Sequence, residues 1–164
     1  WVSYATKISV SPEILSTSMV LGQFHQTDGA GDFSGYPPFE LNLHADGLYV
    51  YTASVAAASQ PTSYSRTQRA GPIQFAQDEW HNVVLRVRFG WTGNAEADVW
   101  IDGESVYSGS GISIGMNDAV GPYFKFGIYY SPAAALQTVV AEYRNFEIGP
   151  DSLNGRVLNP LRIW

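Results

Sequence analysis

Hydrophobic and polar residues alternate with a period of two over most of the chain, which is the pattern of half-buried β-strands. The alternating runs are rich in Val, Thr, Tyr, Phe and Ile, and they end at Gly, Pro, Asp or Asn. Two Asp-Gly pairs, Asp46-Gly47 and Asp102-Gly103, lie between such runs and predict tight hairpin turns. The pattern predicts strands over residues 1–10, 18–26, 38–45, 47–55, 82–89, 95–101, 121–130 and 139–148, with a further short one over 104–107.

The segments between these strands show no sustained helical period. Residues 53–59 come nearest, but that run is short and rich in Ser. Residues 29–38 and 60–71 are expected to be loops, the second an exposed one because it is polar and carries Arg66 and Arg69. Regularly spaced short strands without helices are typical of an antiparallel two-sheet β-sandwich. We therefore expect an all-β fold, a concanavalin-like jelly roll that forms a single domain over residues 1–164.

The composition excludes several other classes of protein. Only 15% of the 164 residues are charged and 14% are aromatic, whereas disordered chains are rich in charge and poor in aromatic residues. No run of about 20 apolar residues is present, so no membrane-spanning helix is expected. The formal net charge of −6 argues against a general nucleic-acid binder, which carries a basic face. The absence of cysteine excludes disulfide frameworks and thiolate metal sites.

The first residues of the chain read as the middle of a strand. The chain opens Trp1-Val2-Ser3-Tyr4, without an initiator Met, a basic n-region or an apolar h-region. We therefore expect no signal peptide within this chain, and we expect the parent protein to carry residues upstream of Trp1.

Strand 121–130 is predicted to have two chemically different faces. Alternation gives a core face with Phe124, Phe126, Ile128 and Tyr130. The opposite face carries Tyr123, Lys125, Gly127 and Tyr129. A glycine on this polar face leaves room for a ligand to lie across the sheet.

Three further strands offer polar groups by the same rule. Strict alternation groups Met19, Leu21, Gln23 and His25 on one face of strand 18–26. It also places Asn42 and His44 opposite Phe39, Leu41 and Leu43, and Arg86 and Arg88 opposite Val83, Leu85 and Val87. If these polar faces converge, they form a groove with local positive charge on an acidic protein. Asn42, Arg86 and Arg88 are therefore candidate substrate-binding residues.

Two motifs carry a resemblance to a known family. Gln23-Phe24-His25 resembles the Gln-x-His motif of jelly-roll polysaccharide lyases, and residues 123–129 resemble their Tyr-Phe-Lys-x-Gly-x-Tyr strand. Residues 79–87, residues 97–103 and the pair Asn117-Asp118 are similar to the heparin-lyase-I-like family, which is related to alginate and glucuronan lyases. The resemblance covers the chain from about residue 1 to residue 149.

The resemblance implies β-elimination on a uronate-containing polysaccharide. A base must remove the proton next to the uronate carboxylate, and hydrogen-bond donors must stabilise the charge that develops. By the resemblance, Gln23, His25 and Tyr129 match the catalytic positions, and Tyr123 and Lys125 match positions that line the groove. Gln23 offers an amide donor, His25 a base or a donor, and Tyr129 a proton for the leaving oxygen. Tyr129 could instead be the base if a cation such as Lys125 stabilised its phenolate.

The resemblance also sets the expected partners and exposes one departure. An acidic polysaccharide is the expected partner, without nucleic acid or membrane, in an extracellular or periplasmic location. No cofactor is expected to be required; Asp28, Asp32 and Asp118 lack the spacing of an EF-hand loop, so turns are favoured there over a structural calcium site. Alginate-lyase relatives carry an Arg-x-Glu-Leu-Arg strand ahead of Gln-x-His, whereas the only cation ahead of Gln23 here is Lys7. Such a strand either lies upstream of Trp1 or is absent. If it is absent, neutralisation of the carboxylate would rest on Gln23, His25 and Arg86.

Other interpretations remain open beside the lyase. A non-catalytic, lectin-like sandwich that binds carbohydrate would use the same fold, and an open edge at Trp1 could pair with another chain in a larger assembly. Glycoside hydrolases need paired carboxylates, and Glu96 and Asp98 share a strand face, but their surroundings read as an ordinary hairpin. His44 and His81 are expected to be structural.

Overall fold

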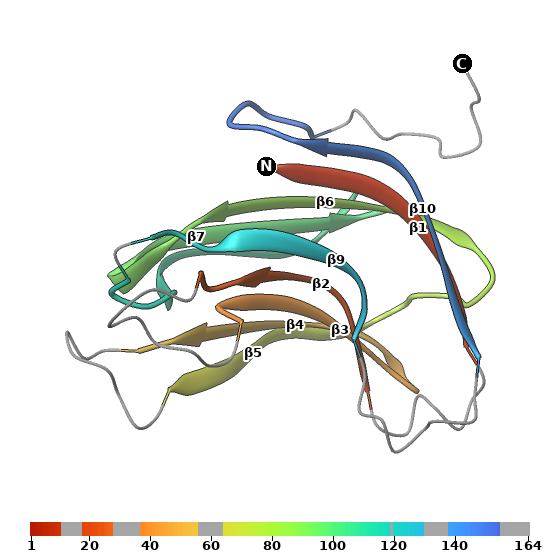
Figure 1. Ribbon diagram of the computed structural model, residues 1–164, viewed down its shortest axis with the longest axis horizontal. Coiled ribbons are helices and arrows are strands. Elements are labelled where there is room, and N and C mark those ends of the chain that lie inside the picture. Colours follow the sequence, from red (N-terminus) through yellow and green to blue (C-terminus); the bar gives the residue numbers. More distant parts are fainter. Residues whose placement is uncertain (11–17, 28–36, 56–63, 119, 130–137, 155–164) are drawn as a thin grey trace.

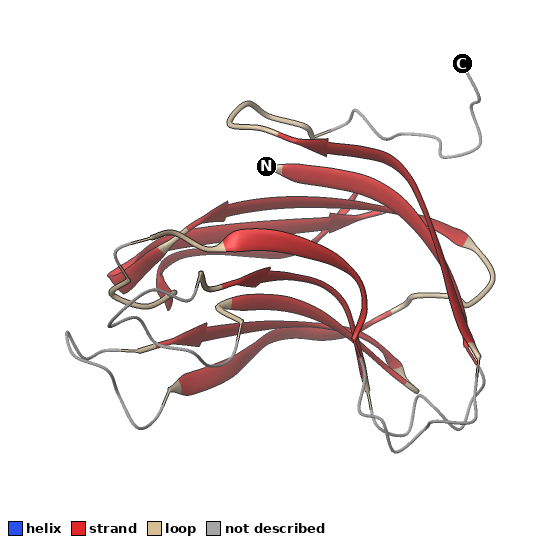
Figure 2. Cartoon of the chain, in the orientation of Figure 1, coloured by secondary structure: helices blue, strands red, loops and turns tan. Residues whose placement is uncertain are grey.

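The computed structural model describes residues 1–10, 18–27, 37–55, 64–118, 120–129 and 138–154. Ten strands lie within these ranges, and the described residues contain no helix (Figure 2). The strands are β1 (Val2–Val10), β2 (Met19–His25), β3 (Phe39–His44), β4 (Gly47–Ser54), β5 (Ser65–Ile73), β6 (Trp80–Arg88), β7 (Gly90–Ile101), β8 (Glu104–Ile114), β9 (Tyr123–Tyr129) and β10 (Val139–Ile148).

The strands form two five-stranded sheets that are stacked as layers (Figure 1). One sheet has the order β10-β1-β6-β7-β8 and the other the order β5-β4-β3-β2-β9. Neighbouring strands within each sheet are antiparallel. Each sheet combines strands from both ends of the chain, as in a jelly roll. The predicted all-β antiparallel sandwich is confirmed.

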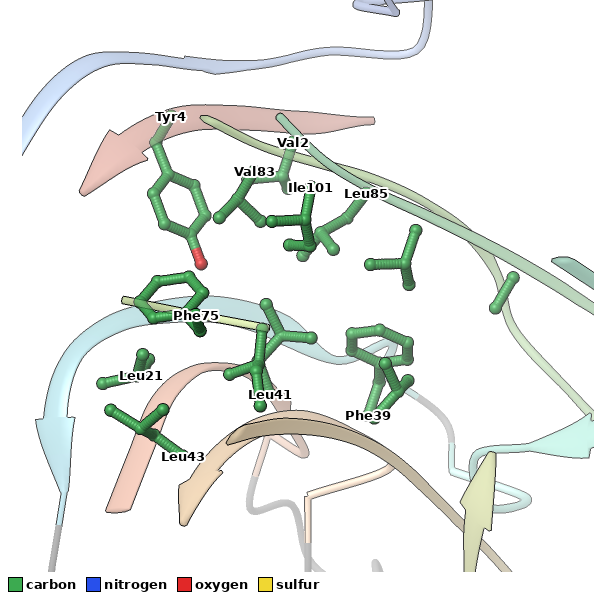
Figure 3. Close-up of a cluster of buried hydrophobic side chains, with 14 of the residues drawn as sticks. Val2, Tyr4, Leu21, Phe39, Leu41, Leu43, Phe75, Val83, Leu85 and Ile101 are labelled. Carbon is green, nitrogen blue, oxygen red and sulfur yellow. The ribbon is translucent and has the colours of Figure 1, made fainter. Parts of the chain in front are cut away.

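The core lies between the two sheets and is built from side chains of alternate residues. In Figure 3, side chains from the first sheet, such as Tyr4 and Leu85, point toward those of the second sheet, such as Leu41 and Leu43. The Tyr4 and Leu85 side chains are completely buried. Because each strand presents every second side chain to this layer, the residues between them are directed to the outer faces.

The strand predictions are confirmed, most of them with small shifts at their ends, and both Asp-Gly hairpins are present. Two strands are longer than predicted: β7 begins at Gly90 rather than at residue 95, and β8 ends at Ile114 rather than at residue 107. The prediction of an exposed loop over residues 60–71 is wrong for its described part, because most of residues 64–71 belong to β5. β5 is the last strand of its sheet, where one long edge faces solvent and charged side chains are tolerated. Its sequence therefore lacks the hydrophobic alternation that marks the other strands.

A β-bulge in β2 corrects the predicted faces of that strand. Val20 pairs with Asn42 but Gly22 pairs with Leu41, so β2 has one more residue than β3 at this point. Met19 and Leu21 are buried in the core, whereas Gln23 lines the outer face of the sheet. Strict alternation had grouped these side chains together. The extra residue separates them and turns the polar motif away from the core.

Alternation in β9 places the polar residues as predicted, but one core assignment is wrong. Phe124 packs against the core, whereas the side chain of Phe126 is 48% exposed. Its ring stacks on Phe146, with the ring centroids 4.7 Å apart, and meets Tyr143 edge-on. Since β9 and β10 are edge strands of opposite sheets, Phe126 lies at the margin of the sandwich rather than in its interior.

Several predictions fall outside the described residues. They concern most of the loop 29–38, residues 60–63 of the loop 60–71, and the single positions Asp28, Asp32 and Tyr130. Within the described part of the chain, no helix has the length and hydropathy needed to cross a membrane.

Candidate active site

A groove of about 710 Å³ lies on the outer face of the sheet β5-β4-β3-β2-β9. Four of the five strands contribute side chains to it. The residues that line it are Ser18, Val20, Gly22, Gln23, His25, Pro37, Glu40, Asn42, Arg66, Lys125, Phe126, Gly127, Ile128 and Tyr129.

The β2 strand supplies an amide and an imidazole, from Gln23 and His25. Both side chains face the groove because they follow the bulge with one residue between them. Nδ1 of His25 lies 2.9 Å from the carbonyl oxygen of Gln26, which can only accept a hydrogen bond. Nδ1 therefore carries the hydrogen, and in the neutral ring Nε2 keeps the lone pair that a base requires.

The β9 strand supplies a phenol and an ammonium group beside β2. Lys125 is the cross-strand partner of Gln23, and Tyr129 is the partner of Val20. The Tyr129 side chain is 71% exposed, so its hydroxyl is accessible to a ligand. Tyr123 lies opposite His25, with the ring centroids 5.9 Å apart, and Lys125 Nζ is 5.0 Å from the centre of the Tyr123 ring.

The floor of the groove on β3 is polar and buried. Asn42 is only 5% exposed, and its Oδ1 has no hydrogen-bond partner among the described residues. Its neighbour on the same face, Glu40, is 4% exposed. A buried acceptor without a partner is costly, so an amide in this position is suited to a ligand that donates a hydrogen bond.

Arg66 is the groove residue that sequence reasoning missed. It starts on β5 and crosses β4, where its guanidinium lies 3.6 Å from the centre of the Tyr51 ring. Its Nε donates a hydrogen bond of 2.7 Å to Oε1 of Glu40 on β3, and Nη2 bonds the same oxygen. The sequence does show a charged residue at position 66, but the sequence analysis assigned residues 60–71 to a loop, so Arg66 was not placed on the sheet that carries the groove.

The structure does not bring Arg86 and Arg88 to the groove. Both lie on β6, which belongs to the opposite sheet, and their side chains form an ion-pair ladder on its outer face. Arg86 pairs with Asp98 at 2.8 Å and with Glu96 at 2.6 Å, and these partners raise its pKa, with the Asp98 hydrogen bond as the largest cause. Alternation fixes which face of a strand a residue occupies, but it does not fix the sheet to which the strand belongs.

His81 has a structural role at the corner before β6. Its Nδ1 lies 2.7 Å from Asp102 Oδ2, and its Nε2 lies 2.9 Å from the carbonyl oxygen of Ala76. The ring also stacks on Phe75, with the centroids 4.1 Å apart. These contacts tie the Asp102-Gly103 hairpin to the start of β6, as expected for a packing residue.

The described residues contain no group of three or more His, Asp or Glu side chains that could hold a metal ion. Three aspartates were considered for calcium, and of these only Asp118 lies within the described part of the chain. Asp118 already interacts with another group of the protein.

The fold and the groove together define a class of protein. It is a jelly-roll sandwich with a polar groove across the outer face of one sheet, a class that includes enzymes and lectin-like binding modules. The sequence profile of one family, described as polysaccharide lyase, matches residues 1–145. This chain belongs to the polysaccharide lyase family.

Solved structures show the same fold in two lyases. The endo-β-1,4-glucuronan lyase of the fungus Trichoderma reesei superposes with a TM-score of 0.71 at 17% identity over 88% of this chain. An alginate lyase of Pseudomonas aeruginosa superposes with a TM-score of 0.54 at 18% identity over 91% of this chain. The chain spans 66% of the first and 63% of the second, slightly less than two thirds of each. A comparison with curated protein sequences finds no significant match.

Proposed function

We propose that this protein is a lyase that cleaves an acidic, uronate-containing polysaccharide by β-elimination. The observation that carries the proposal is the shared groove, in which Gln23, His25 and Tyr129 lie together with the cations Lys125 and Arg66. The family assignment supports the reaction type. The two solved lyases are named for glucuronan and alginate, and this supports a uronate polymer as the substrate class.

In the proposed reaction, a base removes the proton from the ring carbon next to the uronate carboxylate. The electron pair forms a carbon–carbon double bond, and the bond to the glycosidic oxygen on the adjacent carbon breaks. That oxygen leaves with a proton from a general acid, so the products are a new non-reducing-end unsaturated uronate and a shortened chain. Each proton transfer by a positioned side chain contributes about 10²–10⁴-fold to the rate.

The proposed roles follow from the chemistry of the groove side chains. Gln23 donates hydrogen bonds to the carboxylate, where negative charge develops. His25 offers Nε2, and Tyr129 offers an accessible phenol for protonation of the leaving oxygen or for removal of the carbon-bound proton. Lys125 adds a positive charge to the same groove, which suits an anionic substrate. Arg66 takes over the neutralising role that Arg86 was expected to have.

Incubation with glucuronan, alginate, heparin and hyaluronan tests the proposal. Elimination gives a conjugated product whose ultraviolet absorbance rises with time, and we expect this with at least one polyuronate. Binding without any absorbance change would contradict the lyase and would instead support a non-catalytic carbohydrate-binding module. An extracellular or periplasmic location belongs to the same proposal, because such polymers lie outside the cell.

The Tyr129→Phe variant tests the assignment of the general acid or base. We expect turnover to fall by about 10²–10⁴-fold, because only the hydroxyl that transfers the proton is removed. The melting temperature should stay at the wild-type value, because the side chain is largely exposed. A wild-type rate in this variant would remove Tyr129 from the mechanism.

A further inference from the structure

The outer face of the sheet β10-β1-β6-β7-β8 lies on the side of the molecule opposite the groove, and it carries tryptophan side chains. The odd-numbered residues 83–87 of β6 and 95–101 of β7 belong to the core, so alternation directs Trp80 and Trp100 outward. Trp100 is the cross-strand partner of Val84, and its ring stacks on Trp1 with the centroids 5.6 Å apart. The backbones at Trp80 and Trp100 are roughly 14 Å apart, from four residues along β6 and one strand spacing. We call Trp80, Trp100 and the surface between them the tryptophan face.

Arg144 of β10 is fixed on this face without using its hydrogen-bond donors. Its guanidinium carbon lies 4.2 Å from the centre of the Trp80 ring, and Lys7 Nζ lies 5.6 Å from the same ring. Arg144 is exposed, and within the described part of the chain it takes part in no ion pair. A guanidinium that is stacked on a ring keeps its N–H groups in its own plane, so they stay available to a ligand.

The other charges that surround Arg144 on this face are already compensated. Ion pairs join Lys7 with Glu142, Arg86 with Glu96 and Asp98, and Arg88 with Glu96. Glu147, a further acid of β10, already interacts with another group. Arg144 is therefore an unpaired cation on a chain whose formal net charge is −6, and it favours an anionic ligand at this place.

Small side chains with unpaired polar atoms lie between the two tryptophans. Ser3, Ala5, Asn82 and Val84 occupy adjacent positions of β1 and β6, and each is at most 7% exposed. Ser3 Oγ and Asn82 Oδ1 are buried without a hydrogen-bond partner among the described residues. Buried polar atoms without partners are costly, so this surface is suited to a ligand whose hydroxyl groups reach them after small side-chain rotations.

We propose that Arg144 and the tryptophan face form a second, non-catalytic site that binds a polyuronate chain on the sheet opposite the groove. The identity of the occupant rests on the proposed function, since it is the same class of polysaccharide. A guanidinium binds a carboxylate through paired hydrogen bonds, and an aromatic ring packs against the apolar side of a sugar. The unpaired positive charge favours a polyuronate over a neutral glycan. Two sites on opposite faces allow one long polymer to be held at two points, which strengthens its retention.

The test observes the two faces separately by NMR in the Tyr129→Phe background, in which the proposed cleavage is suppressed. Hexasaccharides of glucuronan and of alginate are titrated, together with their carboxyl-reduced forms. The indole N–H of Trp80 reports on the tryptophan face, and the ring of His25 reports on the groove. Arg144→Gln is the test variant, because it removes the guanidinium and keeps a polar side chain. Arg88→Ala is the matched control, since it changes an exposed, ion-paired arginine eight residues along β6 from Trp80.

We expect at least one hexasaccharide to shift the Trp80 signal saturably, and Arg144→Gln to weaken the affinity read from this signal about 10-fold. The carboxyl-reduced form should bind this face as weakly as the charged form binds the variant, and the Arg88→Ala control should match its parent. A Trp80 signal that neither hexasaccharide moves would overturn the inference. Equal affinity in the Arg144→Gln variant, or equal binding of the carboxyl-reduced form, would overturn it as well. Failure of the proposed function is distinct, since the chain with Tyr129 intact would then release no unsaturated product, whatever the Trp80 signal does.

Discussion

At the scale of single residues, Gly22 allows the close approach on which the geometry of β2 depends. A Cβ atom at this position would lie 2.8 Å from the hydroxyl oxygen of Tyr4 and 3.4 Å from the ring of Phe124. The Tyr4 hydroxyl is buried without a hydrogen-bond partner among the described residues, and burial raises the pKa of Tyr4 well above its usual value. The next residue, Gln23, faces the groove. The missing side chain of Gly22 therefore lets β2 pack closely on Tyr4 at the point where the Gln23 side chain turns outward.

The Gly22→Ala variant should therefore lose about 1–3 kcal/mol of unfolding free energy, the usual cost of overpacking a core. The added Tyr4→Phe change should restore most of this loss, because it removes the atom that collides with the new methyl group. Chemical denaturation of the two single variants and the double variant measures the coupling. Additive effects would show that Tyr4 does not limit this position.

His44 gives a residue-scale prediction about pH. Burial lowers the pKa of His44 from 6.5, Asp46 raises it, Arg66 lowers it and Glu40 raises it, with burial the largest effect. Between the folded value and 6.5 the unfolded chain binds more protons, so the free energy of unfolding rises with pH across this window and levels off above it. Titration of the His44 ring by NMR should give a midpoint below 6.5. A midpoint above 6.5 would show that the carboxylates outweigh burial.

At the scale of elements, the sequence predicts which face of a strand a side chain occupies better than it predicts where that strand lies in the two sheets. Periodicity located most strands, set the faces of β3 and placed the polar residues of β9, because a period of two depends only on local geometry. It assigned Phe126 of β9 to the core, whereas this side chain is 48% exposed. It could not place Arg86 and Arg66 on their sheets, since strand order is decided by contacts between residues far apart in the chain. It also failed at the β2 bulge, because an inserted residue leaves no mark in the composition of a strand.

The ion-pair ladder on β6 and β7 leads to an element-scale prediction. Arg88 is 62% exposed and pairs with Glu96 at 2.8 Å, so the Arg88→Ala variant should lose less than about 1 kcal/mol of unfolding free energy. Its KM for a polyuronate should equal that of wild type, because β6 lies in the sheet opposite the groove. A several-fold rise in KM would restore the original hypothesis that this strand binds substrate.

At the scale of the whole molecule, the hydrophobic core and the candidate active site lie on opposite faces of the same sheet. The inner face of β5-β4-β3-β2-β9 packs against the other sheet, and the outer face carries the groove. Phe39 is fully buried in the shared layer, whereas Phe126 stands at the margin between β9 and β10. Substitutions on the inner face should therefore reduce stability, and those on the outer face should reduce turnover.

A comparison of two phenylalanines tests this division. Phe39→Ala should lower the free energy of unfolding by about 3–5 kcal/mol, the usual loss for a buried phenylalanine. Phe126→Ala should lower it by only about 1–2 kcal/mol, because nearly half of that side chain is already exposed. Urea denaturation of both variants measures the difference. Equal losses would mean that the margin between β9 and β10 is as tightly packed as the centre.

The extra residue in β2 also determines what a small deletion would do. Loss of one residue between Met19 and Gln23 would only remove the bulge, because Gln23 would still lie opposite Glu40 with its side chain toward the groove. Loss of two residues would instead place Gln23 opposite Leu41, and the amide and imidazole would then rotate into the hydrophobic interior. Every letter of the motif would survive in both chains. A search that relies on the motif alone would not separate them, whereas counting residues from the last buried position before the motif would.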